Sequence, residues 1–313
     1  MRRVIETYGT AIAGAAMILF FVIFAPKFAT PSNLANVLKD TSFLAILGLG
    51  FTLALVVSEL DLSIADVASL AAVACGALVH GGWPPVVAVG AALAIGWAAG
   101  AFNGFGVTRL RIPSLIMTLG VAAVAKGLGY MLTQGVAFVG RWPAEFTGIA
   151  RGAVFGVPYL VLWMLGCGAL AYVLIGWTRT GAHMKATGEA VEAARLAGIR
   201  TARMKRLGLT LSGVLAAVMA VLLAASLSSA APSMAGDYFL YAIAAVLLGM
   251  TMFRPGHPNV PGTLFAAFAL KVLGNGLVLL GVAYYWQDII LGLIIIGSVA
   301  FSASVTKKVA FTV

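Results

Sequence analysis

The chain has 313 residues, of which 62% are hydrophobic and only 10% are charged. A soluble domain is typically about half apolar and a quarter charged, so this composition excludes a soluble globular protein and predicts a chain that uses lipid as its solvent. The net charge is +10. We interpret it as a sign of membrane topology rather than of nucleic-acid binding, because Lys and Arg gather on the cytosolic side of membrane proteins.

Ten apolar runs follow one another along the chain, most of them near the roughly 20 residues that a helix needs to cross the hydrocarbon. They cover residues 10–25, 37–57, 62–79, 85–107, 112–132, 157–177, 207–227, 238–252, 262–282 and 286–304. The first run follows two arginines, as in a signal peptide, but no small-residue cleavage site comes after it, so we expect a retained helix. The pattern predicts one all-α integral membrane domain over residues 1–313, with about ten transmembrane helices.

The positions of Lys and Arg predict the orientation of these helices. If both termini are cytoplasmic, fourteen of the 20 basic residues lie in inner segments. Outer segments then hold only Lys27, Lys39, Arg141 and Arg151, and two lysines, Lys126 and Lys271, fall within spans. An excess of this size on one side is the pattern that sets orientation in multi-pass proteins. An odd number of spans would distribute the basic segments over both sides and remove this excess.

Two connections are long. Residues 133–156 are predicted outside, and residues 178–206, which are rich in charge and Ala, are predicted inside. We expect the inner loop to contact a partner, because it is the one sizeable cytosolic segment of the chain.

A weak internal repetition accompanies the ten spans. The fourth span closes on Asn103, which Gly104 follows, and the ninth holds Asn275 between two glycines. Equivalent segments five spans apart would have opposite orientation, which is the mark of an inverted repeat. Chance similarity between Gly-rich helices explains the match equally well at this point.

Within the inner loop, Glu189, Glu192, Ala193 and Ala194 are compatible with a short helix, and Gly198 can end it in a left-handed conformation. Small Ala side chains would let this helix dock closely in a groove on a partner. The spacing resembles the Glu-Ala-Ala loop of ABC-importer permeases. A solvated amphipathic helix is the alternative interpretation.

Further stretches extend this resemblance to most of the chain, from about residue 33 to residue 301. The chain is similar to the membrane subunits of ribose-type sugar ABC importers, in order and with matching spacing. The matching stretches are GFTL at 50–53, DLSI at 61–64, LRIPSLIMTLG at 110–120, AIAAV at 242–246, PGTL at 261–264 and YWQ at 285–287.

The resemblance implies a permease subunit of the bacterial inner membrane that carries a sugar or sugar-like solute. Known members handle ribose, xylose, galactose or a furanone-type autoinducer. It also implies three partners: a cytosolic ABC ATPase, a second permease subunit and a periplasmic sugar-binding protein. We expect no cofactor in this chain, because ATP and Mg²⁺ would bind to the ATPase subunit.

Polar residues within apolar spans are candidates for the translocation pathway, because polar groups in lipid are costly. Asn103, Thr118, Lys126 and Asn275 are the candidates here, although each can instead serve helix packing. For Lys126 we expect pairing with an acid between residues 59 and 66.

Two other classes of protein compete with the importer subunit. An ion-coupled secondary transporter would need acidic or His groups deep in the spans, whereas the acids here cluster at span ends. A membrane-embedded enzyme would need a convergent set of acid, His or Cys residues, which the sequence lacks, as it lacks a phosphate-binding loop. We therefore expect no enzymatic activity of the chain itself.

Overall fold

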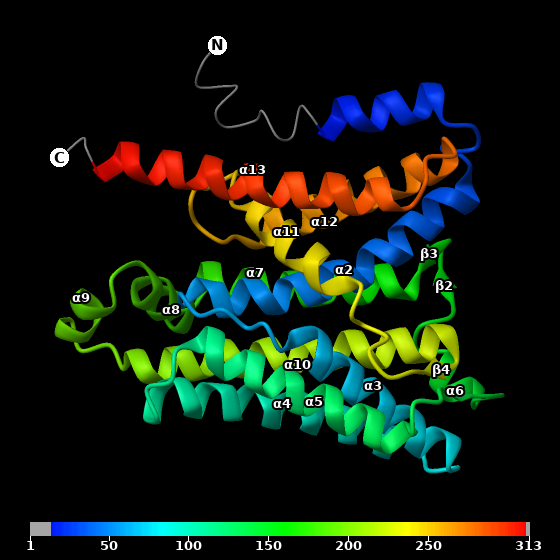
Figure 1. Ribbon diagram of the computed structural model, residues 1–313, viewed down its shortest axis with the longest axis horizontal. Coiled ribbons are helices and arrows are strands. Elements are labelled where there is room, and N and C mark those ends of the chain that lie inside the picture. Colours follow the sequence, from blue (N-terminus) through cyan, green and yellow to red (C-terminus); the bar gives the residue numbers. More distant parts are fainter. Residues whose placement is uncertain (1–13, 311–313) are drawn as a thin grey trace.

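The computed structural model describes residues 14–310, except for the side chains of residues 299 and 301–310. Its helices run roughly parallel to the longest axis of the molecule (Figure 1). A first helix spans Gly14–Phe24. The other helices are α2 (Pro31–Val56), α3 (Ile64–His80), α4 (Pro85–Arg109), α5 (Ser114–Thr133), α6 (Ala144–Thr147), α7 (Tyr159–Trp177), α8 (Arg179–Glu189), α9 (Val191–Leu196), α10 (Thr201–Leu227), α11 (Tyr238–Gly249), α12 (Val260–Leu279) and α13 (Tyr285–Ala310).

Six of the helices in the described part are long and apolar enough to cross a membrane: α2, α4, α5, α7, α10 and α12. The remaining four predicted runs coincide with shorter apolar helices, which are Gly14–Phe24, α3, α11 and the first part of α13 (Tyr285–Ser298). The break between the second and third runs is confirmed, since α2 ends at Val56 and α3 begins at Ile64. Residues 10–13 of the first predicted run lie outside the described residues.

Four two-residue strands, which the apolar pattern did not predict, lie in the connections. Strand β1 (Phe138–Val139) pairs antiparallel with β4 (Ser229–Ala230), so that Phe138 faces Ala230. Strand β2 (Ala153–Val154) pairs with β3 (Val157–Pro158) in a tight hairpin. The first pair fastens the long 133–156 connection to the end of α10.

Helix α2 lies at the centre of the bundle. In its most apolar window 83% of the residues are buried inside the protein, against 22% for α4. A helix that is apolar on every side can be covered by protein or by lipid, and these fractions decide between the two. Helix α2 is therefore an interior helix, whereas α4 presents most of its surface to the surroundings.

Two groups of helices make similar contacts. Helix α10 packs on α3 and α4, and α3 also contacts α5. In the other half, α2 packs on α11 and α12, and α11 also contacts α13 (Figure 1). Each central helix thus belongs to one half of the chain and packs against helices of the other half.

Helices α4 and α10 approach each other most closely at two facing glycines. A Cβ atom added to Gly96 would lie 2.2 Å from the carbonyl oxygen of Gly213, and one added to Gly213 would lie 2.2 Å from the carbonyl oxygen of Gly96. Small residues of this kind permit close backbone contact between helices in lipid, where van der Waals packing drives association.

We expect Gly213→Val to destabilise the folded protein by about 1–3 kcal/mol, because backbone atoms cannot yield to the added side chain. Gly166→Val is the matched control, since a Cβ there would meet no atom within 4 Å. Thermal unfolding of both variants in detergent tests the prediction. Equal melting temperatures for the two variants would show that this crossing is not tightly packed.

Candidate coupling site

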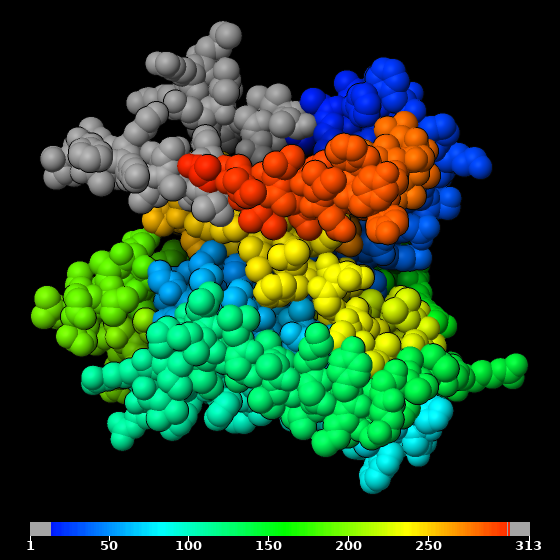
Figure 2. Space-filling model, in the orientation of Figure 1, coloured from blue at the N-terminus to red at the C-terminus, as the bar shows by residue number. Residues whose placement is uncertain are grey.

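The connection formed by residues 178–206 makes a lobe at one end of the bundle. In the space-filling view it is the yellow-green projection at the left (Figure 2). Thr178 starts α8 by accepting a hydrogen bond from the Gly181 amide at 3.0 Å, while its hydroxyl donates to the Leu174 carbonyl at 2.6 Å. A Cβ on Gly181 would meet the Leu174 carbonyl oxygen. Helix α8 therefore folds back tightly against the end of α7.

The short helix α9 ends at Leu196, and Gly198 closes the turn that follows it. The Gly198 amide donates to the Arg195 carbonyl, and the Ile199 amide donates to the Ala194 carbonyl, each at 3.0 Å. Gly198 has φ +82°, so this is the paired closure that places glycine in the left-handed region after a helix. A Cβ at Gly198 would meet nothing within 4 Å, so the turn faces open space.

The outer surface of α9 combines small residues with one large apolar side chain. Ala194 is buried beneath the helix, whereas Glu192 and Ala193 are exposed. Leu196 is 89% exposed at the end of the helix. Glu192 forms an exposed ion pair with Arg195 at 2.8 Å. The exposed residues between Glu192 and Gly198, which exclude Ala194, are called the docking surface below.

Glu189 does not share the docking helix with the other predicted residues. It is the last residue of α8, and the helical conformation is interrupted at Ala190, whose φ is −153°. Its carboxylate lies 3.8 Å from Nδ1 of His257, in the connection between α11 and α12. The predicted single helix is therefore two helices, and Glu189 faces another element.

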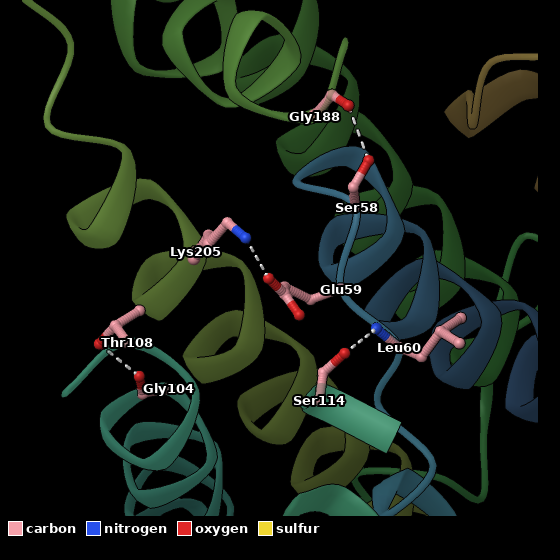
Figure 3. A network of polar contacts seen from close by, with 8 residues as sticks. All are labelled: Ser58, Glu59, Leu60, Gly104, Thr108, Ser114, Gly188 and Lys205. Carbon is pink, nitrogen blue, oxygen red and sulfur yellow. Dashed lines mark hydrogen bonds and ion pairs between the residues drawn. The ribbon is translucent and has the colours of Figure 1, made fainter. Parts of the chain in front are cut away.

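Behind the docking surface, polar contacts join this lobe to the connection between α2 and α3 (Figure 3). The Ser58 hydroxyl donates to the Gly188 carbonyl at 2.7 Å. A Cβ on Gly188 would lie 2.1 Å from the Val56 carbonyl oxygen, so the end of α8 touches the end of α2 directly. The end of α8 is thus in backbone contact with the central helix.

An ion pair makes the second connection. Nζ of Lys205, in the first turns of α10, lies 2.5 Å from a carboxylate oxygen of Glu59 (Figure 3). The Glu59 side chain is only 6% exposed and that of Lys205 23%. A buried pair of this kind fixes the position of the α2–α3 connection relative to α10.

Two predicted pathway residues organise the same connection. Thr118 accepts from the Leu62 amide at 3.1 Å and donates to the Leu60 carbonyl at 3.2 Å. Asn103 donates to the Ser63 hydroxyl at 2.9 Å, and it is completely buried. Both side chains therefore bond to the connection between α2 and α3.

The other two predicted pathway residues lie elsewhere. Asn275 exchanges two side-chain hydrogen bonds with Asn33, at 2.9 and 3.0 Å, and ties α12 to the start of α2. Lys126 is exposed on α5, and its charge acts on Asp66 at the start of α3, one of the three acids expected near it. Among the described residues it forms no ion pair within 4 Å.

Sequence reasoning missed Ser58, Gly188 and Lys205 as members of a network. The sequence did contain a signal for this connection, since the polar residues Ser58 and Glu59 separate two apolar runs. Their partners are 130 and 146 residues away, however, and only the folded chain brings them together.

The fold and this network define a multi-pass membrane protein with a helical lobe fastened to its central helix. Residues 33–299 match the family described as "Branched-chain amino acid transport system / permease component". The chain belongs to this permease family, and the matched range agrees with the extent predicted from the motifs.

Curated relatives support the assignment. The ribose import permease protein of Escherichia coli (strain K12) is 35% identical over 289 residues, which cover 91% of this chain and 90% of that protein. The ribose import permease protein of Bacillus subtilis (strain 168) is 29% identical, with 94% and 91% covered. The autoinducer 2 import system permease protein of Yersinia pseudotuberculosis (serotype O:3, strain YPIII) is 30% identical, with 92% and 84% covered.

A solved structure described as an inward-facing conformation of a metal-chelate type ABC transporter has a similar fold. Its TM-score is 0.51 at 13% identity, and the alignment covers 97% of this chain and 99% of that one. At this identity the likeness concerns the fold alone.

Proposed function

We propose that the chain is the transmembrane permease subunit of an ATP-driven importer that carries a sugar or a sugar-like solute across the bacterial inner membrane. The relatives named for ribose and autoinducer 2 import support this solute class. The complete transporter also contains a cytosolic ATPase, a second permease subunit and a periplasmic binding protein. ATP and Mg²⁺ bind to the ATPase.

The docking surface is the observation that carries the proposal. An isolated leucine that is 89% exposed, beside small residues and a glycine turn in open space, suits a groove on another protein. In the mechanism, closure of the ATPase dimer moves α9. The contacts of Gly188 and Lys205 transmit this motion to the α2–α3 connection. The bundle then switches between an outward-open and an inward-open conformation.

Reconstitution of the permease with its ATPase and binding protein in vesicles tests this function. We expect the binding protein to stimulate both ATP hydrolysis and uptake when it carries its solute. Ribose, other sugars and autoinducer 2 are the solutes to test. Uptake by the permease alone under an ion gradient would instead establish an ion-coupled transporter.

The topology belongs to the same proposal: ten spans, both termini and residues 178–206 in the cytosol, and residues 133–156 outside. The excess of Lys and Arg in the segments assigned to the inside supports it. The similar contacts of α10 and α2 with the opposite halves support an inverted repeat.

Single-cysteine labelling tests the topology after both native cysteines, Cys75 and Cys167, are replaced. We expect Phe155→Cys, at the fully exposed tip of the β2–β3 hairpin, to react with an impermeant reagent from outside. Arg195→Cys should react only after the membrane is opened. Outside labelling at position 195 would overturn the orientation.

A further inference from the structure

A cavity of about 870 Å³ lies beside the lobe, apart from the docking surface. Its walls come from α8, the ends of α2 and α7, and the connection between α11 and α12. In Figure 1 this connection is the yellow-orange loop on the α8 side of the molecule. A space of this size holds a small molecule or the headgroup region of a lipid.

The polar wall of the cavity carries an excess of positive charge. Lys185 of α8 and Arg254 of the α11–α12 connection both line it, and among the described residues neither has a carboxylate within 4 Å. The one acidic residue in the wall, Glu189, lies 3.8 Å from His257. Two cations in one cavity that are not paired with a carboxylate of the described part of the chain suit an anionic group.

Apolar residues of α7 form another part of the wall. Tyr172 and Trp177 line the cavity, and aromatic side chains of this kind are enriched where hydrocarbon meets water. Leu170, Val173 and Trp177 follow one another at helical spacing on the same side of α7, and they are 75%, 50% and 80% exposed. An apolar chain can lie along this stripe while its charged end occupies the cavity.

We propose that the cavity binds the phosphate headgroup of an anionic phospholipid, with the acyl chains along α7. Basic pockets between helices on the cytosolic side recognise such headgroups, and the position of this one rests on the orientation proposed above. A bound headgroup bridges α8 and the α11–α12 connection. The lipid therefore steadies the base of the coupling lobe from the membrane side.

Native mass spectrometry of the purified full-length permease tests the site, with phosphatidylglycerol as the probe and phosphatidylcholine as the zwitterionic comparison. Each cation near an anionic lipid contributes about fivefold in affinity. We expect Lys185→Gln and Arg254→Gln each to weaken phosphatidylglycerol binding about fivefold, and the double variant to weaken it roughly 25-fold. Phosphatidylcholine binding should be weak in the parent and unchanged by these substitutions.

The matched control is Arg200→Gln with Arg203→Gln, which removes two exposed basic residues of the same loop that do not line the cavity. An equal loss of phosphatidylglycerol binding in the control would show that the effect comes from general surface charge, and it would overturn the proposal. Displacement of the lipid by inorganic phosphate would assign the cavity to a soluble phosphate compound instead. Lipid retention is read without the ATPase, so this result is independent of the transport assay.

Discussion

Lys205→Met is expected to reduce the stability of the folded permease by about 3 kcal/mol, because it leaves the Glu59 carboxylate buried without its cation. The contact is close, at 2.5 Å, and the Glu59 side chain is almost wholly enclosed. Removing one partner of a buried pair costs more than the pair itself contributes. Unfolding of the purified protein in detergent, followed by circular dichroism, measures the loss.

A double variant separates the pair from its surroundings. We expect Glu59→Gln combined with Lys205→Met to recover most of the lost stability, since no unpaired charge then remains. Arg203→Met is the matched control, because Arg203 lies two residues away on the exposed side of α10. The single variant Glu59→Gln is measured as well. If the stability loss of the double variant equals the sum of the losses in Lys205→Met and Glu59→Gln, the two side chains act independently and the ion pair does not stabilise the α2–α3 connection.

Gly198→Asp is expected to lower binding-protein-stimulated uptake at least about tenfold, equivalent to about 1.4 kcal/mol, while the spans remain inserted. The substitution strains a backbone at φ +82° and adds bulk and charge to the docking surface. Because the Cβ position lies in open space, the added side chain meets no atom of this chain, and the expected loss comes from the strained turn and from contact with the ATPase. Uptake and ATPase activity of reconstituted vesicles measure the result.

Two further variants assign the cause. Gly198→Ala introduces the backbone strain with little bulk, so any additional loss in Gly198→Asp reports contact with the ATPase. Gly156→Asp repeats the substitution at the same φ of +82° and in equally open space, in the β2–β3 hairpin far from the lobe. Parent-like uptake by Gly198→Asp would show that this turn is not the coupling element.

Local features of the sequence were sufficient for the helices and for the end of α9. Apolar runs become helices because a backbone in lipid must satisfy its hydrogen bonds within the segment. The glycine after α9 adopts the left-handed conformation because only a residue without a Cβ does so at little cost. Both effects depend on near neighbours in the chain, so reading the sequence predicted them.

Tertiary structure alone decided the partners of the polar residues. Asn103 and Thr118, which the sequence left as candidates for the pathway or for helix packing, bond to the α2–α3 connection, which the packing of α3, α4 and α5 brings to them. Glu59 was one of the acids with which Lys126 could pair, but it pairs with Lys205, 146 residues along the chain. Such choices depend on which helix faces meet. Composition and spacing do not specify those faces when lipid and protein cover apolar surface equally well.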